Sequence, residues 1–133
     1  MILINKGFVA AMESSVDDIN RSKLFQVQFI HKGIPSLSEQ KAIHLFRILQ
    51  EILHNTIKHS GARNLRIEMK MKKNILTILT EDDGSGFNYQ PKVTDHAGLG
   101  LRNLLSRTEI LGGNMYIDSE IGKGTSYTFE VPL

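Results

Sequence analysis

The chain contains the stretch Glu51-Ile52-Leu53-His54-Asn55-Thr56-Ile57-Lys58-His59, in which apolar and polar residues recur at helical spacing. Glu51, Asn55, Lys58 and His59 lie at offsets of zero, four, seven and eight, so they share one face of the predicted helix. A carboxylate, an amide, an ammonium group and an imidazole together suit a cation and phosphate oxygens. For this helix taken alone, an ordinary solvated face with a Glu–Lys pair is an equally good explanation.

The segments around this helix predict an α+β fold. The helix runs from a capping box at Ser36 and Glu39 to Ser60-Gly61, and its apolar stripe, which includes Phe46 and Leu53, lies roughly opposite the polar face. Two further helices and five strands are predicted at 8–20 and 101–111, and at 24–31, 65–70, 75–81, 114–118 and 125–131. Their order predicts one domain over 1–133, a two-layer α/β sandwich with three helices on one face of a mixed sheet.

A second polar motif, Asp82-Asp83-Gly84-Ser85-Gly86, follows the strand predicted at 75–81. A carboxylate at a strand end can point into a pocket, and two glycines let the backbone approach a flat ligand closely. Such an acceptor suits an exocyclic amine such as that of adenine. An acidic turn without a ligand is the other interpretation of this motif.

Two glycine motifs complete the set. Gly98-Leu99-Gly100-Leu101 opens the third helix, where backbone amides and the helix dipole favour phosphate. It is not a Rossmann fingerprint, because Asn103 stands where a third glycine is required, and the chain has no Gly-x-x-x-x-Gly-Lys-Ser/Thr loop. The second motif, Gly122-Lys123-Gly124-Thr125, brings a hydroxyl to the same edge or is simply a hairpin turn.

Composition limits the classes of function. The 133 residues include 41% hydrophobic and 23% charged residues, with a net charge of +2 and no cysteine, as in a single soluble domain without disulfides. We expect no nucleic acid to bind, because the basic excess is small. No apolar run approaches the roughly 20 residues that cross a bilayer, so we expect no membrane contact by this domain.

Together and in this order, the four segments resemble the superfamily of gyrase, the heat-shock protein 90 chaperones, sensor histidine kinases and MutL. The resemblance covers about Ile43 to Leu133 and implies the Bergerat-type ATP-binding fold, with ATP and Mg²⁺ as cofactors. The ending Lys58-His59-Ser60 is similar to the branch of nitrate and desaturase sensors. By resemblance, the ATP-binding residues are Asn55, Lys58, His59, Asp82, Gly84, Gly86, Gly98, Leu99, Gly100, Leu101 and Thr125.

The resemblance also implies individual roles. Asn55 stands where the family holds Mg²⁺, and Asp82 rather than Asp83 takes the place of the adenine-binding carboxylate. Glu51 matches the general base of ATP-hydrolysing relatives; in a kinase it is expected to orient the acceptor or a metal-bound water instead. Thr125 is implied to support the adenine side. The short segment from 88 to 97 corresponds to a lid, which we expect to be mobile without nucleotide.

The implied activity is that of the catalytic domain of a two-component sensor histidine kinase. Family kinases carry an acceptor histidine directly followed by an acidic residue, whereas the five histidines here precede Lys32, Leu45, Asn55, Ser60 and Ala97. The acceptor is therefore expected on a separate dimerisation helix, with a response regulator as an indirect partner. We expect the domain to lie in the cytoplasm, whether or not a longer parent protein is bound to a membrane. The alternatives are a stand-alone serine kinase of the anti-sigma type and a nucleotide-sensing module without turnover.

Overall fold

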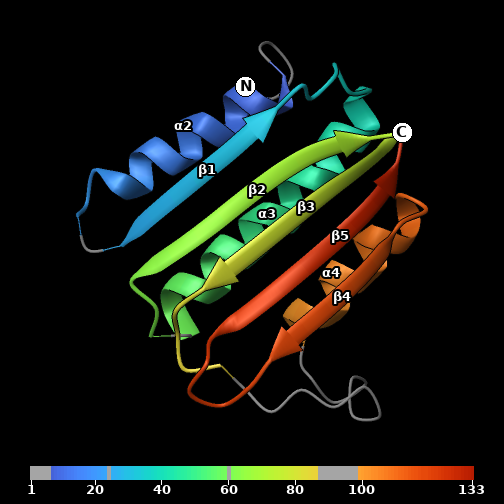
Figure 1. The fold of residues 1–133 in the computed structure, drawn as a ribbon. Coiled ribbons are helices and arrows are strands. Elements are labelled where there is room, and N and C mark those ends of the chain that lie inside the picture. Colours follow the sequence, from blue (N-terminus) through green and yellow to red (C-terminus); the bar gives the residue numbers. More distant parts are fainter. Residues whose placement is uncertain (1–6, 24, 60, 87–98) are drawn as a thin grey trace.

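The computed structural model describes residues 7–23, 25–59, 61–86 and 99–133. These residues form a five-stranded sheet with three helices packed on one of its faces (Figure 1). The elements are α2 (Phe8–Asn20), β1 (Gln26–Lys32), α3 (Glu39–His59), β2 (Asn64–Lys72), β3 (Ile75–Asp82), α4 (Leu99–Ile110), β4 (Asn114–Ser119) and β5 (Thr125–Pro132). The predicted fold class and order of elements are confirmed, and the ends of most elements shift by only one to three residues.

The sheet has the order β1-β2-β3-β5-β4. β1 runs parallel to β2, and every other neighbouring pair is antiparallel, so the sheet is mixed as predicted. β2 and β3 form a tight hairpin, in which Lys73 and Asn74 both adopt a positive φ. Asparagine adopts this conformation more readily than most residues, which explains a short turn without glycine.

The core lies between the sheet and the helices. Every second residue of β2 and β3 points toward the helix layer, and these positions are buried, whereas their neighbours face the open side of the sheet. Helix α3 contributes the largest share from the helix layer, including Leu45, Ile48 and Leu49, none of which is exposed. On the sheet side of the core, the central β3 contributes Leu76 and Ile78.

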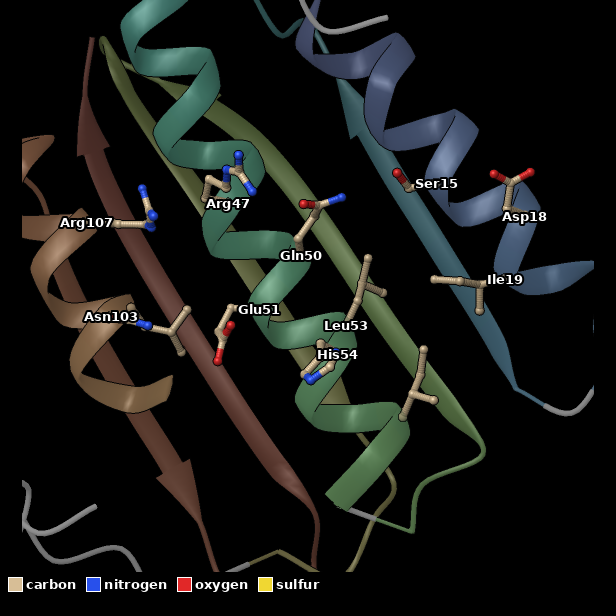
Figure 2. Close-up of a pocket in the computed structure, with 12 residues that line it drawn as sticks. Ser15, Asp18, Ile19, Arg47, Gln50, Glu51, Leu53, His54, Asn103 and Arg107 are labelled. Atoms are coloured by element: carbon tan, nitrogen blue, oxygen red, sulfur yellow. The ribbon is translucent and has the colours of Figure 1, made fainter. Parts of the chain in front are cut away.

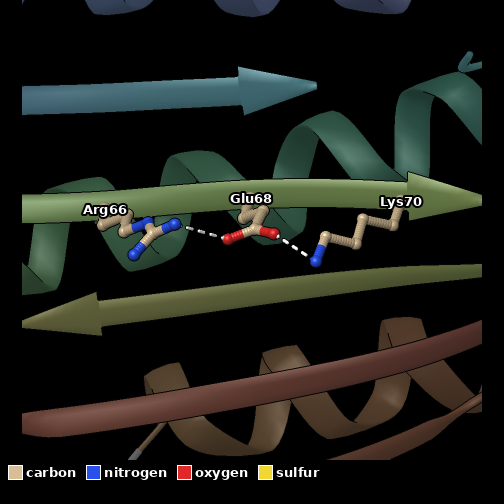
Figure 3. A network of polar contacts seen from close by, with 3 residues as sticks. All are labelled: Arg66, Glu68 and Lys70. Atoms are coloured by element: carbon tan, nitrogen blue, oxygen red, sulfur yellow. Dashed lines mark hydrogen bonds and ion pairs between the residues drawn. The ribbon is translucent and has the colours of Figure 1, made fainter. Parts of the chain in front are cut away.

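The open face of the sheet is kept polar by charged side chains of β2. Figure 3 shows Glu68 between two cations of the same strand: its carboxylate lies 2.8 Å from Arg66 Nη2 and 2.7 Å from Lys70 Nζ. The hydrogen bond from Lys70, together with the positive charges, lowers the pKa of Glu68. This network identifies the face opposite the helices as solvent-facing, which leaves the helix side for the candidate site.

Several element ends meet at one end of the molecule. The last turn of α3, the end of β3, the first turn of α4 and the turn between β4 and β5 all lie together there (Figure 1). These are the four places where the polar motifs occur in the sequence. Among the helices that the structure describes, none is both long and apolar enough to cross a membrane.

Candidate functional site

Two polar side chains of α3 form the first part of the site. Asn55 Nδ2 donates a hydrogen bond of 3.3 Å to Glu51 Oε1, one helical turn earlier. Both residues are partly buried, although the sequence predicted a face opposite the core. The reason is α4, which packs beside α3 and covers this part of its polar face. The bond uses the amide nitrogen of Asn55, so its carbonyl oxygen is the acceptor that the residue presents to a ligand.

Gly100, in the first turn of α4, lies directly against this pair. A Cβ atom added to Gly100 would lie 2.6 Å from Glu51 Oε1, closer than a real Cβ allows, and 3.0 Å from Asn55 Nδ2, a tight contact, so the ends of both side chains would have to move. Glycine therefore lets the amino-terminal end of α4 approach the Glu51–Asn55 pair. The first amides of a helix have no partner within the helix and attract anions. The start of α4 therefore places hydrogen-bond donors beside the carboxamide of Asn55 and the carboxylate of Glu51.

Asp82 forms the second part of the site, at the end of β3. It follows the buried positions Ile78 and Thr80 on the helix-facing side of the strand and is itself half-buried. Its Oδ1 accepts hydrogen bonds from the backbone N–H of Gly84 at 2.8 Å and of Thr125 at 3.3 Å. Burial, with a smaller contribution from the negative charge of Asp83, nevertheless raises the pKa of Asp82 above its ordinary value, and these two bonds oppose that rise.

The neighbouring Asp83 plays a different part. Its carboxylate accepts hydrogen bonds from Arg63 N at 2.9 Å, Asn64 N at 3.0 Å and Asn64 Nδ2 at 2.8 Å. The Asn64 side chain and these backbone bonds lower the pKa of Asp83. Asp83 is exposed and fastens the start of β2 to the end of β3, so both of its oxygens are occupied by the fold.

The two glycine turns near Asp82 are packed together. Gly122 N donates a 2.6 Å hydrogen bond to Ser85 O, which joins the loop after β3 to the turn between β4 and β5. Gly86 and Gly124 have φ values of 65° and 80°. A Cβ on Gly124 would collide with the carbonyl oxygen of Asp82, and one on Gly86 with that of Glu120. Both positions therefore need glycine, for conformation and for space.

The remaining predicted site residues are placed as follows. Lys58 is exposed near the end of α3, and His59 is the last residue of that helix, with a side chain outside the described part. Leu99 begins α4, and the neighbouring Leu101 is buried in the core. Gly98 and the predicted lid from 88 to 97 lie outside the described residues.

Two hydroxyls near Asp82 were missed by the sequence analysis. Ser119 Oγ lies 2.8 Å from Oγ1 of Thr125, the residue that is expected to support the adenine side. Thr80 is 1% exposed, and its Oγ1 has no hydrogen-bond partner within the described ranges. A signal for Thr80 was present, because a hydroxyl interrupts the buried apolar series Leu76, Ile78 on the same strand face.

A groove of about 640 Å³ runs over the helix layer beside the site. Figure 2 shows it between α2, α3 and α4, with Glu51 on one wall and Asn103 facing it from α4. Arg107, farther along the groove, donates a 3.3 Å hydrogen bond to Nδ1 of His44. Asp82 is not part of the lining. The groove therefore meets the site at Glu51, whereas Asp82 lies outside it.

The donor set fits Mg²⁺ held mainly by a substrate. No group of three or more His, Cys, Asp or Glu side chains arranged to hold a metal ion occurs in residues 7–23, 25–59, 61–86 and 99–133. Mg²⁺ usually keeps several waters and is bound by one or two protein oxygens together with substrate phosphates. The oxygen of Asn55 and the carboxylate of Glu51, beside the first turn of α4, match that requirement.

Solved structures with the same architecture are histidine kinases. The histidine kinase domain of the Erythrobacter litoralis EL346 blue-light activated histidine kinase superposes with a TM-score of 0.77 at 19% identity, over 93% of this chain and 58% of that one. The Acinetobacter baumannii histidine kinase AdeS gives a TM-score of 0.73 at 17% identity, over 94% and 62%. At these identities the likeness shows the fold alone.

Curated relatives are closer in sequence. DegS of Bacillus subtilis, a signal transduction histidine-protein kinase/phosphatase, is 34% identical over 73% of this chain and 26% of its own length. The sensor histidine kinase ComP of the same organism is 31% identical over 99% and 17%, and the Staphylococcus aureus sensor protein VraS is 32% identical over 86% and 33%. This chain thus spans a third or less of these relatives.

A family model agrees with both comparisons. Residues 40–133 match the model described as "Histidine kinase-, DNA gyrase B-, and HSP90-like ATPase". The matched part contains α3, the Asp82 loop, α4 and the turn before β5, which are the elements that form the candidate site. The chain belongs to the family of histidine kinase-, DNA gyrase B- and HSP90-like ATPases.

Proposed function

We propose that this chain binds Mg-ATP and positions its γ-phosphate for transfer to a histidine on a dimerisation helix that is not part of these 133 residues. The observation that carries the proposal is the contact of Gly100 with the Glu51–Asn55 pair. It brings the donor-rich start of α4 next to a carboxamide oxygen, and such an arrangement suits a phosphate chain and its cation.

Asp82 is proposed to recognise the base. Its Oδ1 is engaged by Gly84 N and Thr125 N, and those two bonds fix the carboxyl plane. The remaining oxygen can accept from the exocyclic amine of adenine, which guanine replaces by a carbonyl. Asp83 cannot take this part, because Arg63 and Asn64 already occupy its oxygens.

The phosphates are proposed to lie between α3 and the start of α4. Asn55 would hold Mg²⁺ through its side-chain oxygen, and Glu51 would hold it through a water molecule. When bound, Mg²⁺ neutralises the charge that develops on the phosphate oxygens. The amides near Gly98, Leu99 and Gly100 and the ammonium group of Lys58 would contact the same phosphates, with His59 beside them.

The proposed chemistry is in-line phosphoryl transfer. A nitrogen of the acceptor imidazole attacks the γ-phosphorus, the bond to the β–γ bridging oxygen breaks, and ADP leaves with that oxygen. Positioning and charge neutralisation supply most of the rate in such reactions. Glu51 of α3 lies beside the start of α4, where the phosphates are proposed to bind. It also lines the groove, through which we expect an acceptor to approach. Its proposed role is to orient the acceptor or the metal-bound water.

The partners follow from this proposal. The direct partner is the histidine-bearing dimerisation domain of the same kinase, and a response regulator would receive the phosphoryl group indirectly. The domain would act in the cytoplasm. A serine kinase of the anti-sigma type is not favoured, because the relatives that match are named as sensor kinases or sensor proteins.

Two measurements test the proposal. Isothermal calorimetry should show that ATP binds more tightly with Mg²⁺ than without it, and more tightly than GTP. Incubation with γ-labelled ATP and a matching dimerisation helix should place acid-labile label on that helix. Equal affinities for ATP and GTP would reject the role of Asp82. Transfer to a separate serine substrate, but not to the histidine helix, would favour the serine kinase.

A further inference from the structure

Thr80 is a buried polar residue that the proposed site does not yet use. It is 1% exposed, and its hydroxyl has no hydrogen-bond partner in the part of the chain that the structure describes. The residues opposite it on the neighbouring strands are Ile67 and Tyr127, so its surroundings are largely apolar. An unpaired hydroxyl in such a place destabilises a protein, and a ligand or water that pairs with it removes the penalty.

The position of Thr80 connects it to Asp82. Successive side chains of a strand alternate between faces, so these two residues point to the same side of β3. Thr80 is the last fully buried position on that side, and Asp82 is the first position that opens to the site. Alternate residues of a strand are about 6.8 Å apart along the chain, so Thr80 and Asp82 are successive residues on the helix-facing side of β3.

Several hydrogen-bonding groups next to Asp82 already have partners. The N–H groups of Gly84 and Thr125 both donate to Asp82 Oδ1. The hydroxyl of Thr125 is paired with Ser119. An ionised carboxylate such as that of Asp82 only accepts hydrogen bonds. Thr80 is a side chain on the same strand face as Asp82 whose O–H is not used within the described residues.

The amino edge of adenine needs one acceptor and one donor from the protein. Its exocyclic amine donates, and the adjacent ring nitrogen N1 accepts. Resting on the proposed function, we propose that Thr80 is a base-recognition residue whose hydroxyl donates to N1, directly or through one water molecule, while Asp82 accepts from the amine. The pair then reads both groups of that edge, and ligand binding gives the hydroxyl of Thr80 an acceptor.

Three variants isolate the hydroxyl. Thr80→Val removes it with little change of shape, Thr80→Ser keeps it, and Thr77→Val makes the same chemical change on the open face of β3. We expect Thr80→Val to weaken ATP binding in calorimetry about three- to tenfold, the effect of one hydrogen bond. Thr80→Ser and Thr77→Val should bind like the unmodified chain. In the absence of nucleotide, Thr80→Val should unfold at a temperature about 2–6 °C higher, because a buried unpaired group is lost.

An analogue of ATP in which a C–H group replaces N1 tests the partner. The unmodified chain should bind this analogue more weakly than ATP, whereas Thr80→Val should bind both nucleotides equally. Unchanged ATP affinity in Thr80→Val, or an equal loss in Thr80→Val and Thr80→Ser, would overturn the inference while the proposed function stands. Failure of the unmodified chain to bind any adenine nucleotide would instead reject the proposed function, and the inference with it.

Discussion

Gly100 and Glu51 are so close that a Cβ atom on the glycine would lie 2.6 Å from the Oε1 atom of the glutamate. Glu51 in turn accepts the hydrogen bond from Asn55. The contact between α4 and α3 at this point therefore depends on the absence of one side chain. A methyl group here would displace the ends of Glu51 and Asn55 and leave the rest of the interface in place.

The first prediction follows from that contact. Gly100→Ala should weaken Mg-ATP binding about tenfold or more, because the added methyl group moves the two side chains proposed to hold the cation. The same substitution should stabilise the helix of the free protein, since alanine is favoured over glycine by about 1 kcal/mol within a helix. Calorimetry with ATP and Mg²⁺, and thermal unfolding of the free protein, measure the two effects separately.

Ser106→Ala is the matched control for Gly100→Ala. Ser106 is exposed on the same helix, one and a half turns farther along, where an alanine touches nothing in the site. It should leave nucleotide affinity unchanged. If Gly100→Ala also binds Mg-ATP with unchanged affinity, the contact with Glu51 is not part of a phosphate site.

The second prediction separates the two aspartates of the loop. Asp82→Asn should weaken ATP binding about 10- to 100-fold, the effect of losing a hydrogen bond to a charged group. Asp83→Asn should bind ATP normally, since that carboxylate is used to fasten β2 to β3. Equilibrium titration with ATP compares the two variants directly, and a similar loss in both would contradict the assignment.

The same pair gives a third prediction, for stability against pH. Burial raises the pKa of Asp82 in the folded chain, so its ionised form opposes folding at neutral pH, and this effect disappears as the pH falls through the raised value. Asp82→Asn should therefore unfold at a higher temperature than the unmodified chain at pH 7, with a smaller difference in acid.

Asp83 should behave in the opposite way. Hydrogen bonds from Asn64 and Arg63 lower its pKa, so its ionised form contributes stability above the ordinary value of 3.8 that is lost as the pH falls through the lowered one. Asp83→Asn should unfold at a lower temperature at pH 7. Thermal unfolding of both variants between pH 3 and pH 7 checks the signs; an equal shift in the two variants would contradict the difference in environment.

The sequence predicted the architecture well because its signals are periodic. Alternation in 65–70 and 75–81, and the apolar stripe of α3, reflect which residues are buried, and the structure confirms the resulting layers. The expectation that Glu51 and Asn55 occupy an open face was incomplete. It came from one helix, and only the position of α4 shows that a second helix covers them.

The hydrogen bonds around Asp82 could not be predicted from the sequence either, because they depend on how separate segments pack. They join residues far apart in the chain, such as Ser85 with Gly122 and Asp82 with Thr125. Spacing within a motif carries no information about which turn packs on which. The sequence therefore named the glycines of both turns and Thr125, but not Ser119, whose hydroxyl lies 2.8 Å from that of Thr125.

The fourth prediction concerns the proposed metal ligand. Asn55→Ala should remove most of the gain in ATP affinity that Mg²⁺ provides, a loss of about 10- to 100-fold, while circular dichroism stays unchanged. His54→Ala is its control, because His54 is the preceding residue of α3 but is exposed in the groove. Titration with ATP at several Mg²⁺ concentrations measures the effect, and an unaltered dependence on Mg²⁺ in Asn55→Ala would exclude the residue as a ligand.

The last prediction is that this chain alone binds ATP but does not phosphorylate its own histidines. Transfer requires an acceptor nitrogen in line with the γ-phosphate, and correct placement supplies much of the rate. His31 is hydrogen-bonded to Glu13 at 2.8 Å, and His44 accepts from Arg107, so both are held away from the proposed phosphate site. His59 ends the rigid α3 and is expected to contact phosphate rather than attack it.

The measurement is incubation with γ-labelled ATP and Mg²⁺, followed by acid and base treatment, since phosphohistidine is lost in acid and survives base. The lid histidine, His96, lies outside the described residues, so His96→Ala is included to identify any label that it carries. We expect no stable label on either chain, and label on a dimerisation helix added in trans. Stoichiometric acid-labile label on the unmodified chain alone would show that it contains its own acceptor, and loss of that label in His96→Ala would identify the residue.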